Sequence, residues 1–265
     1  MGEALLVNAA VLVVAMLLCW LISLKIDDVS FIDAVWGAGM ALMAVTAWFQ
    51  LGYPGVLADM IMLMAAIWGV RLGLHLFLRW RKEGEDQRYK RILKKDREAG
   101  HFARAALVKI FGMQAVLLFM TCLPAQLGIL ASNDPAPVGA LAFAGLALWT
   151  VGMVFETLGD WQLKQFKANP ANEGKILDSG LWRYTRHPNY FGDACVWWGI
   201  WLAAASAGWD IAFYSVVGPI FLTFTLTKWS GAALLEKGMT KKRGDKYTDY
   251  IARTSAFIPW PPKHG

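Results

Sequence analysis

Cysteines and charged residues are both scarce in this chain. Three cysteines, Cys19, Cys122 and Cys195, occur in 265 residues, each inside an apolar run and at unrelated spacings. They predict neither a disulfide framework nor a metal site. Charged residues make up 17% of the chain, and no internal repeat or Gly/Ser linker divides it. We therefore expect a single domain over residues 1–265.

Apolar residues are abundant instead, and they set the broad class. The chain is 57% hydrophobic and holds 14 Trp, which exceeds what a soluble domain normally carries. A helix needs roughly 20 apolar residues to cross the hydrocarbon core of a membrane. The sequence predicts an all-α, polytopic integral membrane protein with seven transmembrane helices, near residues 4–24, 30–51, 55–78, 105–130, 138–160, 189–207 and 211–234.

The cations predict the orientation of these spans. Lys and Arg cluster after the third span, after the fifth and in the tail, whereas the loops at 51–54, 131–137 and 207–210 have none. Because cations are retained on the cytoplasmic side, we expect the N-terminus outside and the C-terminus in the cytoplasm. The net charge of +6 then reflects topology and anionic lipids, not nucleic acid. The first span reads as a signal anchor.

Acidic and basic residues recur on one face at the end of the fifth span. Glu156, Asp160, Lys164 and Lys167 are spaced by four, four and three residues, so they share a helical face. Carboxylates this deep in an apolar run usually bind a partner. The plain alternative is an exposed Asp160–Lys164 ion pair, which would contribute only about 0.3–0.5 kcal/mol.

A dense polar motif, residues 176–193, lies between the fifth and sixth spans. Pro188 is suited to begin a helix, and Asn189 and Asp193 follow four residues apart on its first turns. Arg183 and Arg186 come just before and can grip phosphates with a bidentate fork. This arrangement predicts a socket for a phosphorylated cofactor, while a histidine at 187 indicates little by itself.

The motif L-D-S-G-L-W-R-Y-T-R-H-P-N-Y-F-G-D over 177–193 resembles the nucleotide-binding signature of the membrane sterol reductases and the steroid 5-alpha-reductase family. The preceding D-W-Q-L-K-Q-F-K over 160–167 is similar to that family's helix of an acid followed by cations. The tail segments 242–250 and 257–259 resemble its closing segment. The amino-terminal half is similar only in layout, with Arg71 and His75 one turn apart.

The resemblance implies a seven-helix membrane oxidoreductase that binds NADPH from the cytoplasm. It would reduce the carbon–carbon double bond of a 3-oxo-4-ene steroid or a similar lipid enone. A Gly-rich dinucleotide fingerprint after a strand is missing, so helix-borne side chains would hold the cofactor. By family position the cofactor contacts would be Arg71, Glu156, Asp160, Lys164, Lys167, Arg186, Asn189, Asp193 and Tyr250.

The sequence departs from the family at the residues that polarise the substrate carbonyl. The family uses a Glu and a Tyr from its early spans, but the second span here has no Glu and Trp68 stands three residues before Arg71. Asp33 is the best substitute, since a carboxyl group in an apolar bundle can stay protonated and donate a hydrogen bond. His75 is the second candidate for a catalytic role.

Two other interpretations stay open. The S-adenosylmethionine-dependent membrane methyltransferases of the isoprenylcysteine carboxyl or phospholipid type share an R-H-P-x-Y-x-G core, and Glu236 suits them. A non-catalytic lipid-binding protein explains the apolar bundle but not the polar motif. For either enzyme we expect membrane lipids and a steroid or other hydrophobic substrate as partners, no obligate protein partner, and a place in a bacterial inner membrane with the active site facing the cytoplasm.

Overall fold

A computed structural model describes residues 1–133, 138–229 and 231–263, and every regular element among them is helical. The predicted all-α class is therefore confirmed. Within the described residues, six helical stretches are long and apolar enough to cross a membrane: Gly2–Ile26, Ile32–Phe49, Val56–Glu83, Phe102–Thr121, Ala140–Ala168 and Trp209–Arg243. They support an integral membrane protein. The expected outer loop at 131–137 falls partly outside the described residues, as does residue 230 in the last predicted span.

The predicted count of seven spans is not confirmed. Helix α9 (Pro188–Ala205) lies where the sixth predicted span was placed and is 18 residues long, but it is not among the six apolar stretches. Its first turns carry Asn189 and Asp193, which lower its apolar content. The span predicted over 105–130 is divided, because α7 (Leu123–Leu130) begins anew beside Pro124. The orientation of the termini stays a prediction.

The chain folds into two compact units, and each takes residues from two stretches. Unit 1 consists of Met1–Phe143 with Ile200–Gly218, and unit 2 of Ala144–Gly199 with Pro219–Gly265. The chain passes from one unit to the other within α8 (Ala140–Ala168), α9 and α11 (Val217–Phe224). The expectation of a single domain stays a prediction.

Unit 1 is built on helices α1 (Gly2–Ile26), α2 (Ile32–Phe49) and α3 (Val56–Glu83). Glycines let α2 and α3 touch: a Cβ at Gly37 would lie 2.8 Å from the backbone nitrogen of Gly73. Its other elements are α4 (Gln87–Glu98), α5 (Phe102–Ala105), the π-helix Ala106–Gly112, α6 (Met113–Thr121), α7 and α10 (Trp209–Ser215).

A buried amide network joins the helices of unit 1. Asn8 is fully buried, and its Nδ2 donates to Gln126 Oε1 over 2.9 Å and to the carbonyl of Met43 over 3.2 Å. Gln50 Nε2 donates to Asn8 Oδ1 over 2.9 Å. Buried polar groups need such partners, so these amides fix how α1, α2 and α7 pack.

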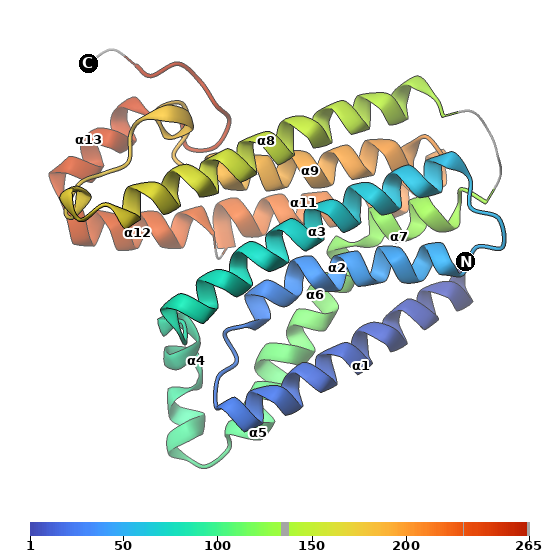
Figure 1. Cartoon of the computed structure of the whole chain (residues 1–265), viewed down its shortest axis with the longest axis horizontal. Helices are drawn as coiled ribbons and strands as arrows, with labels where there is room; N and C mark the ends of the chain where they lie inside the picture. Colours follow the sequence, from blue (N-terminus) through green and yellow to red (C-terminus); the bar gives the residue numbers. More distant parts are fainter. Residues whose placement is uncertain (134–137, 230, 264–265) are drawn as a thin grey trace. The chain divides into compact units, whose positions relative to one another are not determined.

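Unit 2 is built on α8 and α9, which run side by side (Figure 1). A Cβ at Gly192 would lie 2.6 Å from the carbonyl oxygen of Gly152, and one at Gly199 would lie 2.6 Å from the backbone nitrogen of Trp149. The rest of the unit is α11, the π-helix Thr225–Trp229, α12 (Ala232–Arg243), α13 (Asp245–Arg253) and short 3-10 turns at Pro170–Asn172 and Gly180–Arg183.

Candidate functional site

The predicted polar face of α8 divides into a buried acidic part and an exposed basic part. Glu156 and Asp160 are only 2% and 9% exposed, whereas Lys164 and Lys167 are exposed at the end of the helix. Asn189 Nδ2 donates to Asp160 Oδ1 over 3.0 Å, which joins α8 to the first turn of α9. Because Asp160 is buried, the alternative of a solvent-exposed Asp160–Lys164 pair does not describe this site.

Close helix packing brings these polar groups together. A Cβ at Gly159 would lie 3.1 Å from the backbone nitrogen of Asn189, and the missing side chain of Gly192 leaves room for the backbone of α8 at Glu156. Asp193, half-buried, stands one turn beyond Asn189 on α9. The structure thus gathers Glu156, Asp160, Asn189 and Asp193 on two helices in contact.

The loop before α9 is fastened onto α8. Gly180 has φ of +60°, which favours glycine, and a Cβ there would lie 2.5 Å from Gln162 Nε2. The backbone nitrogen of Leu181 donates to Gln162 Oε1 over 3.0 Å, and Trp182 Nε1 donates to the carbonyl of Gly159 over 3.1 Å. The loop therefore has a fixed course past the Asp160–Asn189 pair.

The side chain of Arg186 is buried in unit 2 and hydrogen-bonded there. Its Nε donates to Glu236 Oε1 over 2.7 Å and its Nη2 to Glu236 Oε2 over 3.3 Å. Its Nη1 donates to the carbonyls of Thr254 and Ile251 over 2.6 and 3.2 Å. His187 Nε2 lies 2.9 Å from Glu236 Oε1. Arg186 is 8% exposed, so this fork links α12 and the end of α13 to the motif.

The tail closes over the same motif. Tyr250 donates its hydroxyl proton to the carbonyl of Trp182, and Thr185 donates to the carbonyl of Phe257 over 2.7 Å. Burial, together with Glu236, raises the pKa of Tyr247 to about 12, and burial beside Tyr247 also raises the pKa of Tyr250. Both hydroxyls therefore stay neutral at physiological pH and suit packing and donation.

The remaining predicted residues, Asp33, Arg71 and His75, belong to unit 1. Asp33 Oδ1 accepts a hydrogen bond from the hydroxyl of Tyr89 over 2.7 Å, and its Oδ2 accepts one from Arg88 Nη2 over 2.6 Å. The side chain thus accepts on both oxygens, whereas the expected role needed a donor. Arg71 and His75 are half-buried on α3, one turn apart.

Sequence reasoning missed several residues that organise the site in unit 2. Glu236 was noted only for the methyltransferase alternative, and Gln162 and Trp182 were not singled out. Glu236 carried a usable signal, because it is a carboxylate directly after the apolar pair 234–235, and carboxylates next to apolar runs usually have partners. Gln162 and Trp182 carried no such signal, since uncharged polar and aromatic residues are common at membrane interfaces.

A family model described as "Protein of unknown function (DUF1295)" matches residues 19–254, which is most of the chain. The chain belongs to this family. The family is steroid 5-alpha-reductase-like, so the resemblance found in the sequence is confirmed. Its motif residues, from Asp160 through Asp193, lie inside the matched range.

Named relatives are distant or cover part of the chain. Mouse (Mus musculus) 3-oxo-5-alpha-steroid 4-dehydrogenase 1 is 30% identical over 44% of this chain and 41% of its own length. A probable O-methyltransferase of Ustilaginoidea virens is 42% identical over 44% of this chain and 37% of its own. An uncharacterised protein of Schizosaccharomyces pombe is 23% identical over 91% and 75%. The chain thus spans less than half the length of the named enzymes, and no solved structure matches it.

Proposed function

We propose that the protein is an NADPH-dependent membrane oxidoreductase that reduces the carbon–carbon double bond of a 3-oxo-4-ene steroid or similar lipid enone. The observation that carries the proposal is the Asp160–Asn189 hydrogen bond, with Glu156 and Asp193 on adjoining turns of α8 and α9. Family membership and relatives named 3-oxo-5-alpha-steroid 4-dehydrogenase support the reaction class.

The residues present fit this cofactor. NADPH offers ribose hydroxyls and a carboxamide, which carboxylates and an amide can bind, and phosphates, which Lys164 and Lys167 can meet at the exposed end of α8. When bound, NADPH would supply the hydride. Arg186 was expected to contact phosphate, but it donates hydrogen bonds to Glu236 and to two backbone carbonyls. We therefore assign it to holding the motif in place.

The proposed reaction also needs a donor that polarises the substrate carbonyl. A donor that stabilises a developing enolate is typically worth several kcal/mol. We retain Asp33 and His75 as candidates for that role. Asp33 accepts from Tyr89 and Arg88, so to donate it would have to give up one of these contacts.

Ligand-dependent thermal stability tests the cofactor assignment. Detergent-purified protein is melted with NADPH, NADH and S-adenosylmethionine, because a ligand that binds only the folded state stabilises by about 2.7 kcal/mol at 100 times its Kd. We expect selective stabilisation by NADPH. Asp193→Ala should lose most of it, whereas Asp249→Ala, which removes an exposed carboxylate from α13, should keep it. If both variants bound NADPH like the parent, the site would be misplaced.

Methyl transfer from S-adenosylmethionine is the second candidate, favoured by one observation each from sequence and structure. The probable O-methyltransferase of Ustilaginoidea virens is a 42% identical relative, and Glu236 joins both Arg186 and His187 of the R-H-P motif. Stabilisation by S-adenosylmethionine alone would move the protein to this class.

The proposed orientation places the polar end of α8 and the motif on the cytoplasmic side of a bacterial inner membrane. The cation-free loops on the opposite side support this arrangement. Labelling of single cysteines introduced at 173 and at 53 from either side of sealed vesicles would test it, since the two positions should react from opposite sides.

A further inference from the structure

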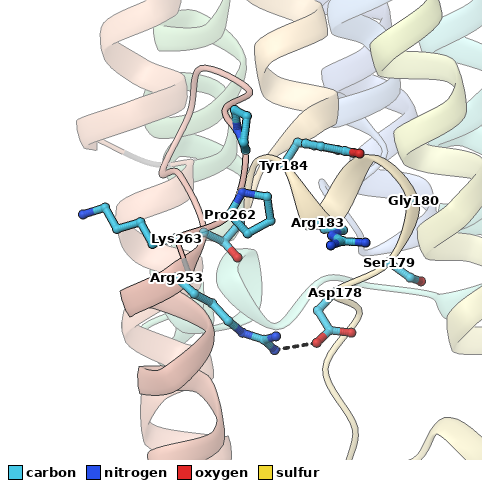
Figure 2. Close-up of a pocket in the computed structure, with 10 residues that line it drawn as sticks. Asp178, Ser179, Gly180, Arg183, Tyr184, Arg253, Pro262 and Lys263 are labelled. Carbon is cyan, nitrogen blue, oxygen red and sulfur yellow. Dashed lines mark hydrogen bonds and ion pairs between the residues drawn. The ribbon is translucent and has the colours of Figure 1, made fainter. Parts of the chain in front are cut away.

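A pocket of about 780 Å³ lies on unit 2, between the loop before α9 and the tail (Figure 2). The loop contributes residues 178–180 with Arg183 and Tyr184, and the tail side contributes Arg253, Thr254 and residues 261–263. Two backbone hydrogen bonds hold its walls: the nitrogen of Trp260 donates to the carbonyl of Tyr184, and that of Lys263 to the carbonyl of Arg253, both over 3.0 Å. The pocket is therefore a fixed feature of the tail fold.

Positive charge dominates this pocket. Arg183, Arg253 and Lys263 line it against a single carboxylate, Asp178. Arg253 Nη2 binds Asp178 Oδ2 over 2.5 Å, which leaves the other N–H groups of its guanidinium for a second acceptor. Arg183 makes no ion pair with any residue that the structure describes. Figure 2 shows its guanidinium on the same side of the pocket as the Arg253–Asp178 pair, whereas the side chain of Lys263 extends away from these groups. The chemistry is that of a phosphate site.

Apolar side chains are exposed in the same tail and on the pocket wall. Trp260 and Ile258, which follow one another closely in the tail, are 70% and 65% exposed, and Tyr184 on the pocket wall is 42% exposed. The loop that contributes to the pocket follows α8 in the chain, and α8 is an apolar stretch long enough to span a membrane. Tryptophan and tyrosine next to cations are the combination found at the headgroup level of a bilayer. A soluble phosphate ligand would not require them.

We propose that this pocket binds the phosphate group of an anionic phospholipid, with Arg183 and Arg253 on the phosphate and Trp260 and Ile258 against the acyl region. This site is distinct from the proposed cofactor contacts on α8 and α9. The shared chemistry, a phosphate held by arginines, could also come from inorganic phosphate or from a nucleotide. The exposed apolar residues are what favour the lipid.

The experiment melts the full-length protein in detergent with short-chain phosphatidylglycerol, phosphatidylcholine, inorganic phosphate or NADPH. Arg183→Gln/Arg253→Gln removes the two arginines assigned to the phosphate, and Lys237→Gln/Lys246→Gln removes two exposed cations of α12 and α13 that do not line the pocket. We expect phosphatidylglycerol to stabilise the parent and the control, and its apparent affinity to fall about tenfold or more in the pocket variant. Phosphatidylcholine should have little effect on any of them.

An equal loss in both double variants would overturn the proposal, because it would reduce the effect to general surface charge. The lipid assignment would be overturned if inorganic phosphate or NADPH displaced phosphatidylglycerol from the parent and if the binding of that competitor also depended on the same two residues. If the pocket variant did not fold, native mass spectrometry of Arg183→Gln alone would decide: retention of phosphatidylglycerol at the parental level contradicts the site, and its selective loss supports it.

Discussion

Replacing Gly192 by alanine tests the helix contact on which the candidate site depends. A Cβ there would lie 2.6 Å from the carbonyl oxygen of Gly152 and 2.8 Å from Glu156 Cβ. Ordinary van der Waals contact begins near 3.4 Å, so α8 and α9 would have to separate by most of an ångström. Overpacking of this kind typically costs about 1–3 kcal/mol. Since the neighbour is backbone, we expect the upper end of that range.

Gly238→Ala is the matched control, because a Cβ at Gly238 on α12 meets nothing within 4 Å. Alanine is better than glycine inside a helix by about 0.8–1.0 kcal/mol, so the control should be neutral or slightly stabilised. Thermal melts in detergent should therefore rank the control at or above the parent and Gly192→Ala several degrees below both.

Ligand binding by the same two variants extends the test from packing to the site. Separating α8 from α9 lengthens the Asp160–Asn189 hydrogen bond, so NADPH should stabilise Gly192→Ala less than it stabilises Gly238→Ala. A Gly192→Ala protein with parental stability and parental NADPH response would refute the reasoning, since it would mean that the helices do not touch at this glycine.

Three further variants probe separate parts of the chain. Glu236→Gln should lower the free energy of unfolding by about 2–3 kcal/mol, which is less than breaking a fully buried ion pair costs, because the Glu236 side chain is 21% exposed. A melting temperature equal to that of Glu173→Gln, an exposed control, would contradict the Arg186 pairing. Tyr247 has its pKa raised to about 12, so the stability it contributes is present below pH 10 and lost between about 10 and 12; Tyr247→Phe should flatten that alkaline loss in melts across this range. Asp33→Asn should slow NADPH-dependent enone reduction, and undiminished turnover would remove Asp33 from catalysis.

Hydropathy predicted most of the helices but not where they end. Helix α3 was expected to stop at residue 78 and continues to Glu83, although Arg79, Arg81 and Lys82 are charged. The length of an apolar run reflects the thickness of the hydrocarbon layer. A helix instead ends where its backbone turns, and the backbone after α3 turns at Gly84, which has φ of +72°. The division of the span at 105–130 escaped for a related reason, because both halves are apolar and only Pro124 marks the break.

Helical periodicity placed the acids of α8 on one face, and the structure places Asp160 against Asn189 29 residues later. Pairings between elements further apart were not predictable from spacing. Glu236 lies 50 residues from Arg186, and neither residue's neighbours indicate the other. A buried cation requires a partner, but the sequence does not say which of several acids supplies it.

Arg183 and Arg186 show why the motif could not be divided into structural and ligand-binding cations from sequence. They stand three residues apart in one polar segment, and both were assigned to phosphate. The 3-10 turn ending at Arg183 leaves that side chain exposed, while Arg186 enters the protein and is 8% exposed. Burial commits Arg186 to Glu236 and leaves Arg183 available at the tail pocket. Replacing Arg186 should therefore lower the stability of the protein and its affinity for every ligand. Replacing Arg183 should lower only the affinity for the anionic lipid.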